Sequence, residues 1–230
     1  MLLGNATRKL LNRHTVLAAA LMFLLSASAP RADTSFTGTV VTLNPGSNCG
    51  HIILNTGGNL VVPNVNWYNT NAVWQKAAQA ARLGMTLTFY TSNDPYVQNN
   101  GGSSAPVNWA CGNGDFPLPA AVVETGVADA AAPANPFAYT EGSGTVQVSN
   151  VLSDCTRVRL SDGTTWAYPP VGFGNAFNNV TAIFSGQARG SSLGVYTAND
   201  PEMVGKVEPA PQAIPCGGHN YPLAITAYGG

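Results

Sequence analysis

The sequence has little charge and few of the residues that carry out most enzymatic chemistry. Only 9% of its 230 residues are charged, and it contains three histidines. It has no His-Glu-x-x-His zinc motif and no glycine motif for phosphates or dinucleotides. The basic residues after position 32 form no cluster, which argues against nucleic acid because phosphate binding needs concentrated positive charge. We therefore expect a protein that is not an enzyme, that has no catalytic residues, metal site or cofactor, and that has no nucleic-acid partner.

The first residues have the layout of a secretory signal peptide. A basic start with Arg8, Lys9 and Arg13 precedes an apolar run over 15–25, and small residues follow up to Ala32. That run is shorter than the roughly 20 residues of a membrane-spanning helix. We predict a signal peptide over 1–32, a periplasmic or extracellular location, and no stable membrane insertion after cleavage. An N-terminal anchor helix is the alternative.

The remainder of the chain contains an internal repeat. A shift of 106 residues aligns 38–54 with 144–160, and the same shift aligns 90–95 with 196–201 at five identities in six positions. Three such blocks, the last at a shift of 105, indicate that one domain has been duplicated. We predict a first β-rich domain over 33–120, an Ala/Pro-rich linker over 121–141 and a second β-rich domain over 142–230. Val122-Val123, at the start of that linker, is alternatively a last strand of the first domain.

The repeat also suggests how the cysteines pair. An even number of cysteines in an exported chain indicates disulfides. Each copy carries one early and one late cysteine, so the economical pairing joins Cys49 to Cys111 and Cys155 to Cys216.

Each copy has the pattern of three strands, a helix and a further strand. In the first copy the helix is predicted from the spacing of Val73, Ala77, Ala80 and Ala81, and in the second from Val180 and its neighbours. This order is that of a small OB-type barrel. We predict a mainly β protein with two tandem OB-like β-barrel domains, each with one short helix and one disulfide. Two β-sandwich domains are the alternative.

The pattern resembles exported OB-fold proteins similar to the B subunits of bacterial toxins, the subtilase type in particular. The resemblance rests on the early strand at 38–40, the Cys49 and Cys111 pair, and the helix–glycine–strand passage over 77–90. That family is typically single-domain, assembles in rings and binds glycans, so the resemblance implies a non-catalytic binding role. A covalent tandem departs from the single-domain pattern, and the oligomeric state stays open.

Aromatic residues near the ends of predicted strands are the candidate ligand contacts. Flat rings amid Asn, Thr and Ser are typical of carbohydrate sites, although the same rings can instead fill the core or cover a disulfide. The candidates are Trp67, Tyr68, Trp109, Trp166 and Tyr168. We expect a secreted or periplasmic binding protein with a glycan as ligand. A structural or protein-interaction role in the cell envelope is the alternative, and an exported enzyme is a third.

Overall fold

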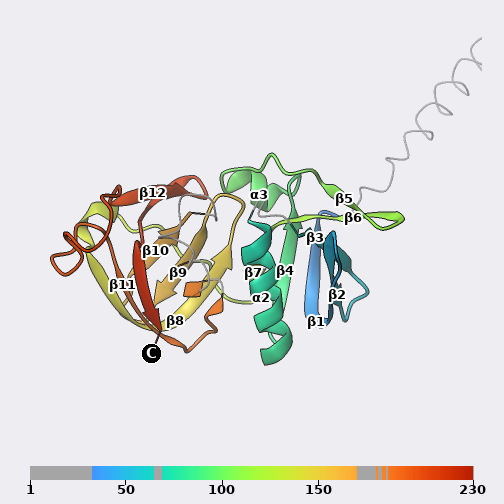
Figure 1. The fold of residues 1–230 in the computed structure, drawn as a ribbon, viewed down its shortest axis with the longest axis horizontal. Coiled ribbons are helices and arrows are strands. Elements are labelled where there is room, and N and C mark those ends of the chain that lie inside the picture. Colours follow the sequence, from blue (N-terminus) through green and yellow to red (C-terminus); the bar gives the residue numbers. More distant parts are fainter. Residues whose placement is uncertain (1–32, 65–68, 170–179, 181–182, 185, 230) are drawn as a thin grey trace, which may run out of the picture. The chain divides into compact units, whose positions relative to one another are not determined.

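The computed structural model describes residues 33–64, 69–169, 180, 183–184 and 186–229, and this part of the chain is mainly β (Figure 1). Its contacts place 34–230 in one compact unit. The predicted signal peptide lies outside the described residues. None of the helices in the described part has the length and apolar character needed to cross a bilayer.

The first half of the compact unit, 34–124, contains one antiparallel set of five strands. They lie in the order β3-β2-β1-β4-β7, with every neighbouring pair antiparallel. Their bounds are β1 Ser35–Pro45, β2 Cys49–Leu54, β3 Asn59–Pro63, β4 Thr86–Thr91 and β7 Pro119–Glu124. A separate hairpin of β5 (Asn108–Cys111) and β6 (Gly114–Pro117) contacts β3.

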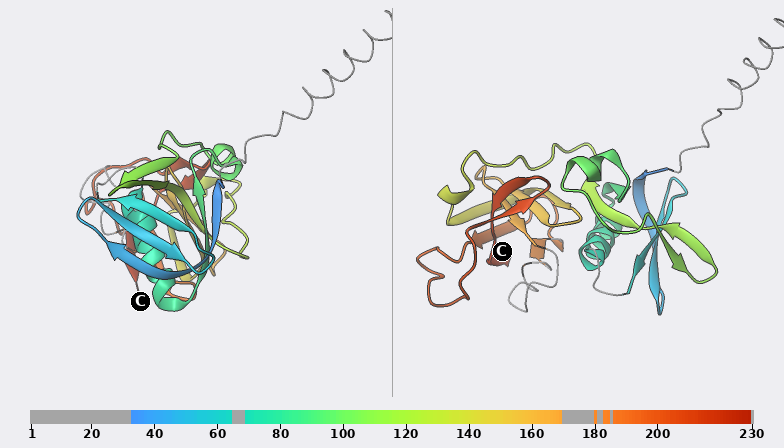
Figure 2. Two further views of the ribbon diagram at one scale, coloured as in Figure 1. Left: turned by 90° about the vertical axis from the view of Figure 1, so that its right-hand side faces the viewer. Right: turned by 90° about the horizontal axis from the view of Figure 1, so that it is seen from above.

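The second half, 140–229, has the same pairing scheme, with β10-β9-β8-β11-β14 in place of β3-β2-β1-β4-β7. Its strands are β8 Glu141–Val151, β9 Thr156–Leu160, β10 Thr165–Tyr168, β11 Ser192–Tyr196 and β14 Thr226–Gly229. The hairpin is formed by β12 (Ala213–Cys216) and β13 (His219–Pro222). Figure 2 shows the first half in blue to green and the second in yellow to red.

The registers of the two halves agree residue by residue. Ser35 pairs with Tyr90 in the first half, and Glu141 pairs with Tyr196 in the second, 106 residues further along in both strands. An irregularity after Val40 in β1 recurs after Val146 in β8. A strand slip of one residue would turn every side chain to the opposite face, so an equal register places equivalent residues in equivalent cores.

The two halves are joined through β7, which pairs with β8 at Val122 and Val151. The resulting 10-stranded sheet does not close on itself through any pairing among the described residues. Val122 and Val123 therefore belong to a strand, β7, as the alternative prediction has it, and the first residues of the predicted linker are part of the sheet. The barrel itself stays a prediction.

The helix α2 (Thr70–Leu83) follows β3 and packs on β1, β3 and β7. Val73, Ala77 and Ala80 are fully buried, as their spacing predicts, whereas Ala81 is exposed. The helix ends at Gly84, whose φ of 68° is left-handed and whose N–H donates to the carbonyl of Ala80. This is the usual glycine end of a helix, which satisfies one of the last carbonyls.

The second helix prediction falls mostly outside the described residues. Val180 and Phe184 are helical, buried and packed in the core of the second half. Between β4 and β5 a short helix, α3 (Pro95–Asn99), begins where the Asp94 carboxylate accepts the N–H of Tyr96. The segment between the halves contains the short 3-10 helix η1 (Pro136–Ala138).

Both predicted disulfides are confirmed. Cys49, the first residue of β2, bonds to Cys111, and Cys155, directly before β9, bonds to Cys216, so each bond ties the start of the second strand of its half to the hairpin that precedes the last strand. Two such bonds fit a protein outside the cytoplasm, where thiols are not kept reduced.

Candidate functional site

A pocket lies in the first half where β1 and β3 end and α2 begins. Its volume is about 270 Å³, near the lower end of the size range of small-molecule sites. None of the described residues that line it is charged, and the set combines an indole with two amides and a hydroxyl. The lining residues are Pro45, Val62, Pro63, Asn64, Thr70, Asn71 and Trp74.

The indole of Trp74 is held in place by its contact with β2. A Cβ atom added to Gly50 would lie 2.5 Å from Cζ3 of the indole, so only glycine allows the ring to lie this close to the strand. Trp74 remains partly exposed toward the pocket that it lines. The close contact with the β2 backbone restricts the ring before any ligand arrives.

The two amides of the pocket are also positioned by hydrogen bonds. Asn64 donates its side-chain N–H to the carbonyl of Gly46, and its backbone N–H donates to the carbonyl of Asn48 at 3.1 Å. Asn71 accepts from Nε2 of Gln75 at 3.3 Å, one turn further along α2. Each of these amides keeps further donor or acceptor capacity for a bound hydroxyl, because an amide has two donors and an acceptor with two lone pairs.

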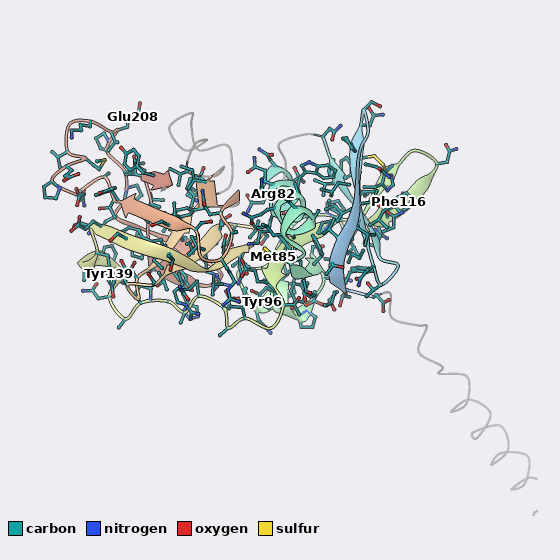
Figure 3. All side chains as sticks on the ribbon, turned by 90° about the horizontal axis from the view of Figure 1, so that it is seen from below. Arg82, Met85, Tyr96, Phe116, Tyr139 and Glu208 are labelled. Carbon is teal, nitrogen blue, oxygen red and sulfur yellow. A yellow bond between two sulfur atoms is a disulfide. The ribbon has the colours of Figure 1, made fainter. Side chains whose placement is uncertain are left out.

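The structure separates the aromatic residues that the sequence grouped together. Trp67 and Tyr68 lie outside the described residues, within the four positions that separate the pocket residue Asn64 from Asn69. Trp109 is half-buried on β5 and packs against the Cys49–Cys111 region, where Figure 3 labels its neighbour on β6, Phe116.

Trp166 and Tyr168, both on β10, are fully buried in the core of the second half. The indole N–H of Trp166 donates to Oγ1 of Thr164 at 2.7 Å. Two rings with no exposed surface cannot stack on a ligand in this conformation, so for these two residues the structure agrees with the core alternative. Trp166 and Tyr168 are two residues apart on one strand, and this spacing is the same in sequence whether the strand is buried or open to solvent.

Trp74 and its amide neighbours could not be assigned from the sequence. Trp74 lies on α2 next to the buried stripe of Val73 and Ala77, and the spacing leaves its direction undecided. The usable signal is Gly50, which is the small residue that the indole requires opposite it.

A second polar cluster joins the two halves around the carboxylate of Asp129. Oδ1 accepts from Nδ2 of Asn150 and from the N–H of Ala130, both at 2.8 Å. Oδ2 accepts from the hydroxyl of Tyr96 at 2.8 Å and from Nη2 of Arg157 at 2.6 Å. Tyr96 belongs to the first half, and Asn150 and Arg157 belong to the second. The Asp129 carboxylate therefore accepts hydrogen bonds from both halves of the unit.

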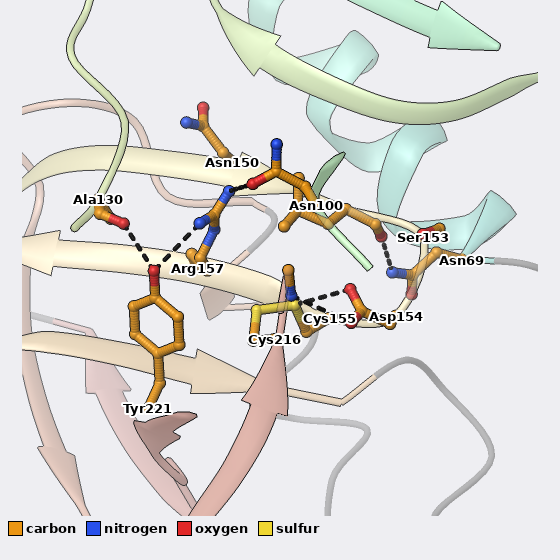
Figure 4. The surroundings of a disulfide bond; sticks show 12 residues. Asn69, Asn100, Ala130, Asn150, Ser153, Asp154, Cys155, Arg157, Cys216 and Tyr221 are labelled. Carbon is orange, nitrogen blue, oxygen red and sulfur yellow. Dashed lines mark hydrogen bonds between the residues drawn. A yellow bond between two sulfur atoms is a disulfide. The ribbon is translucent and has the colours of Figure 1, made fainter. Parts of the chain in front are cut away.

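Arg157 is the buried cation of this cluster (Figure 4). Its Nη1 donates to the hydroxyl of Tyr221 at 3.0 Å, and that hydroxyl donates to the carbonyl of Ala130 at 2.9 Å. Burial disfavours the charged guanidinium, but the nearby Asp129 carboxylate and Tyr221 outweigh it and raise the pKa of Arg157. Burial, followed by the Asp129 charge, likewise raises the pKa of Tyr96. A carboxylate with four donors has little capacity left for a ligand, so we interpret the cluster as a clamp.

A buried ion pair lies beside this clamp. Nζ of Lys76, on α2, is 2.6 Å from Oε1 of Glu124 at the end of β7, and both side chains are at most 2% exposed. Oε2 of Glu124 has no hydrogen-bond partner among the described residues, and Nε of Arg189 lies 4.0 Å from it. Burial lowers the pKa of Lys76, and the charge of Glu124 opposes this effect.

One sequence pattern of serine hydrolases, Gly-x-Ser-x-Gly, occurs at 190–194. In serine hydrolases this motif places the nucleophile on a sharp turn between a strand and a helix. Here Ser192 is the exposed first residue of β11, after a turn, and no hydrogen bond joins it to a histidine among the described residues. The geometry therefore differs from that of a nucleophile elbow.

Comparison with protein-family models, with curated proteins and with solved structures gives no match for this chain.

Proposed function

We propose that the chain is an exported, non-catalytic glycan-binding protein built from two copies of one OB-type domain, and that the Trp74 pocket binds the sugar. The observation that carries the proposal is the combination of a fixed, partly exposed indole with two positioned amides in one uncharged pocket.

The OB-type assignment is supported by topology. The first half has three meandering strands and a helix, after which β4 pairs with β1 and β7 pairs with β4, giving the order β3-β2-β1-β4-β7. β3 and β7, the two ends of this order, contact one another, as in a partly open five-stranded barrel. The duplication is supported by the equal strand registers of the two halves. The resemblance to toxin B subunits is a proposal with the same support.

The choice of ligand class rests on the chemistry of the pocket. The faces of sugar rings are apolar and pack on flat aromatic rings, while their hydroxyls hydrogen-bond to amides. The absence of a charged side chain from the named lining residues favours a neutral sugar over a sialylated or sulfated one. The pocket lies beside the loop between β1 and β2, which is one of the loops that OB folds use for oligosaccharides.

Export is supported by the two disulfides and by the pattern of residues 1–32. A non-catalytic role is supported by the positions of the described histidines. His219 is exposed at the start of β13, and His51 lies beside the first disulfide. Neither of them forms a hydrogen bond with a serine in the part of the chain that the structure describes, as a serine nucleophile would require.

The proposal is tested with an array of immobilised neutral and acidic oligosaccharides, probed with the oxidised protein. We expect binding to neutral glycans. Trp74→Ala and Asn71→Ala should reduce this binding at least tenfold, because each removes a contact of the proposed site.

Trp109→Ala is the matched control, since it removes a half-buried indole of the same half outside the pocket. Far-UV circular dichroism verifies that each variant is folded. Binding that survives Trp74→Ala and Asn71→Ala but is lost in Trp109→Ala would place the site elsewhere. An array without specific binding would reject the glycan proposal.

A protein-interaction role is the second candidate, and it is favoured by the outer edge of β14. In the first half the equivalent strand β7 pairs with β8 on this edge, whereas β14 pairs only with β11 among the described residues. Tyr228 is 57% exposed on this strand. Open strand edges accept further strands, and a lysine there blocks the addition. For this candidate we expect the oxidised protein to self-associate in light scattering, Tyr228→Lys to abolish the association, and Phe137→Lys, at another exposed ring, to leave it unchanged. A wild type that stays monomeric would reject it.

A further inference from the structure

Three potential metal ligands meet where the first disulfide joins β2 to β5. Cys49 and His51 are two residues apart on β2, so their side chains project from the same face of the strand. Cys111 ends β5, and its Sγ lies 3.2 Å from Nε2 of His51. The three candidate ligand atoms lie within 4.8 Å of one another. The cysteines are 62 residues apart in the chain, so no short sequence motif marks this group.

The ring of His51 is oriented as in a metal ligand. Its Nδ1 lies 3.0 Å from Oδ1 of Asn59, and because an amide oxygen only accepts hydrogen bonds, Nδ1 carries the hydrogen. In the neutral ring, Nε2 then has a free lone pair on the side of the sulfur. Histidines that bind metals usually donate their other N–H to an oxygen in this way. The imidazole also contacts the ring of Phe116 edge to face, with 4.9 Å between the ring centroids, and this contact further restricts the orientation of His51.

We propose that reduction of the Cys49–Cys111 bond converts this group into a zinc site with Cys49, Cys111 and His51 as ligands. Two thiolates and an imidazole suit Zn²⁺, with Zn–S near 2.3 Å and Zn–N near 2.0 Å. A tetrahedral ion with these bonds places sulfur and nitrogen about 3.5 Å apart. The observed separation of 3.2 Å between Cys111 Sγ and His51 Nε2 is close to this value, whereas the two bonded sulfurs must move apart to about 3.8 Å when the ion binds. Water takes the fourth position.

The chemical step balances with a phosphine as reductant. The phosphine gives two electrons to the S–S bond and becomes a phosphine oxide with the oxygen of one water molecule, whose two protons complete the two thiols. Zn²⁺ then binds both sulfurs and releases the two thiol protons. His51 loses no proton, because the neutral ring binds through its free lone pair.

The second disulfide has different surroundings. The repeat places Arg157 at the position of His51, and its cationic guanidinium is held by Asp129 and Tyr221. Asp154, whose carboxylate is 3.1 Å from Sγ of Cys155, already accepts the N–H of Gly217. Both sulfurs of this pair belong to residues with no exposed surface, whereas Cys49 and Cys111 are 4% and 8% exposed. A buried cation and a committed carboxylate oppose a metal here, so the proposal concerns the first pair alone.

The test is a titration of the phosphine-reduced full-length protein with Co²⁺ under nitrogen. We expect one equivalent of Co²⁺ to give the visible and near-ultraviolet bands of a tetrahedral thiolate complex, and Zn²⁺ to displace it. His51→Ala should weaken binding at least tenfold, and Asn59→Ala should weaken it about 10- to 100-fold by releasing the ring. Asn59→Asp, which keeps the acceptor, should retain affinity, and Asp154→Ala is the control at the second disulfide.

A thermal readout covers the case in which reduction loosens the fold. Because the three ligands come from two strands, Zn²⁺ should raise the unfolding midpoint of the reduced wild type and leave that of reduced His51→Ala unchanged. The proposal is wrong if the reduced wild type gives no Co²⁺ bands, if the oxidised protein gives the same bands, or if His51→Ala binds as tightly as the wild type.

Discussion

Replacing Asp129 with alanine should lower the free energy of unfolding by about 3 kcal/mol, because it leaves a buried guanidinium without its counter-ion. The side chain of Arg157 is only 4% exposed and loses its 2.6 Å contact with Oδ2. Removing one partner of a buried ion pair costs roughly 3–5 kcal/mol. We use the low end of that range because the Asp129 side chain is 33% exposed, so water can reach its place.

The assay is urea unfolding monitored by circular dichroism, supported by thermal unfolding. For a chain of this size, about 3 kcal/mol corresponds to a fall of roughly 6–12 °C in the unfolding midpoint. Asp115→Ala is the control, since this carboxylate is exposed on β6 and should change stability by less than about 0.5 kcal/mol.

A double variant separates loss of the ion pair from loss of the other hydrogen bonds. Arg157→Met in the Asp129→Ala background removes the unpaired charge, so the double variant should be less destabilised than the sum of the two single variants. A loss below about 1 kcal/mol in Asp129→Ala would refute the clamp, as would additivity in the double variant.

Three further predictions concern other buried groups. Lys76→Met should cost about 3–5 kcal/mol in urea unfolding, because it removes the 2.6 Å buried counter-ion of Glu124 and leaves only the more distant, exposed Arg189. Lys76→Met combined with Glu124→Leu should restore near wild-type stability, and equal losses in both variants would contradict this. Replacing Cys155 and Cys216 with alanine should cost about 4 kcal/mol, from the 61-residue separation that the bond closes, and a loss below 1 kcal/mol would contradict the estimate. Burial raises the pKa of Asp154, so the folded state binds more protons than the unfolded state above the ordinary carboxyl pKa. Stability should therefore fall as the pH rises from the ordinary carboxyl pKa of about 4 through the raised pKa of Asp154, and Asp154→Asn should remove this part of the slope in urea unfolding.

The disulfide pairing could be predicted because the repeat assigns one early and one late cysteine to each copy, and the main helix because its apolar spacing lies within one short segment. Cys49 and Cys111 recur as Cys155 and Cys216, and the apolar spacing of α2 is local. The start of β7 was harder to predict, because its Ala and Pro residues have the composition of a linker. Only the pairing of Val122 with Val151 places this segment in the sheet.

The candidate site was less accessible to sequence reasoning for a physical reason. Its residues come from the ends of β1 and β3 and from α2, so their proximity depends on strand register and helix rotation rather than on spacing. Trp166 illustrates the reverse case, since its position near a strand end gave no sign that the second half buries it completely. Asp129 lies in the segment between the halves, where composition alone indicates a linker.

The most direct test of the glycan proposal is an NMR titration of the tryptophan indole N–H signals with a neutral glycan found on the array. The chain has four tryptophans, and Trp74→Phe assigns the signal of the pocket residue. We expect the Trp74 signal to shift in a saturable manner while the buried Trp166 and half-buried Trp109 signals stay in place. A saturable shift of Trp109 or Trp166 with an unmoved Trp74 signal would contradict the proposed site.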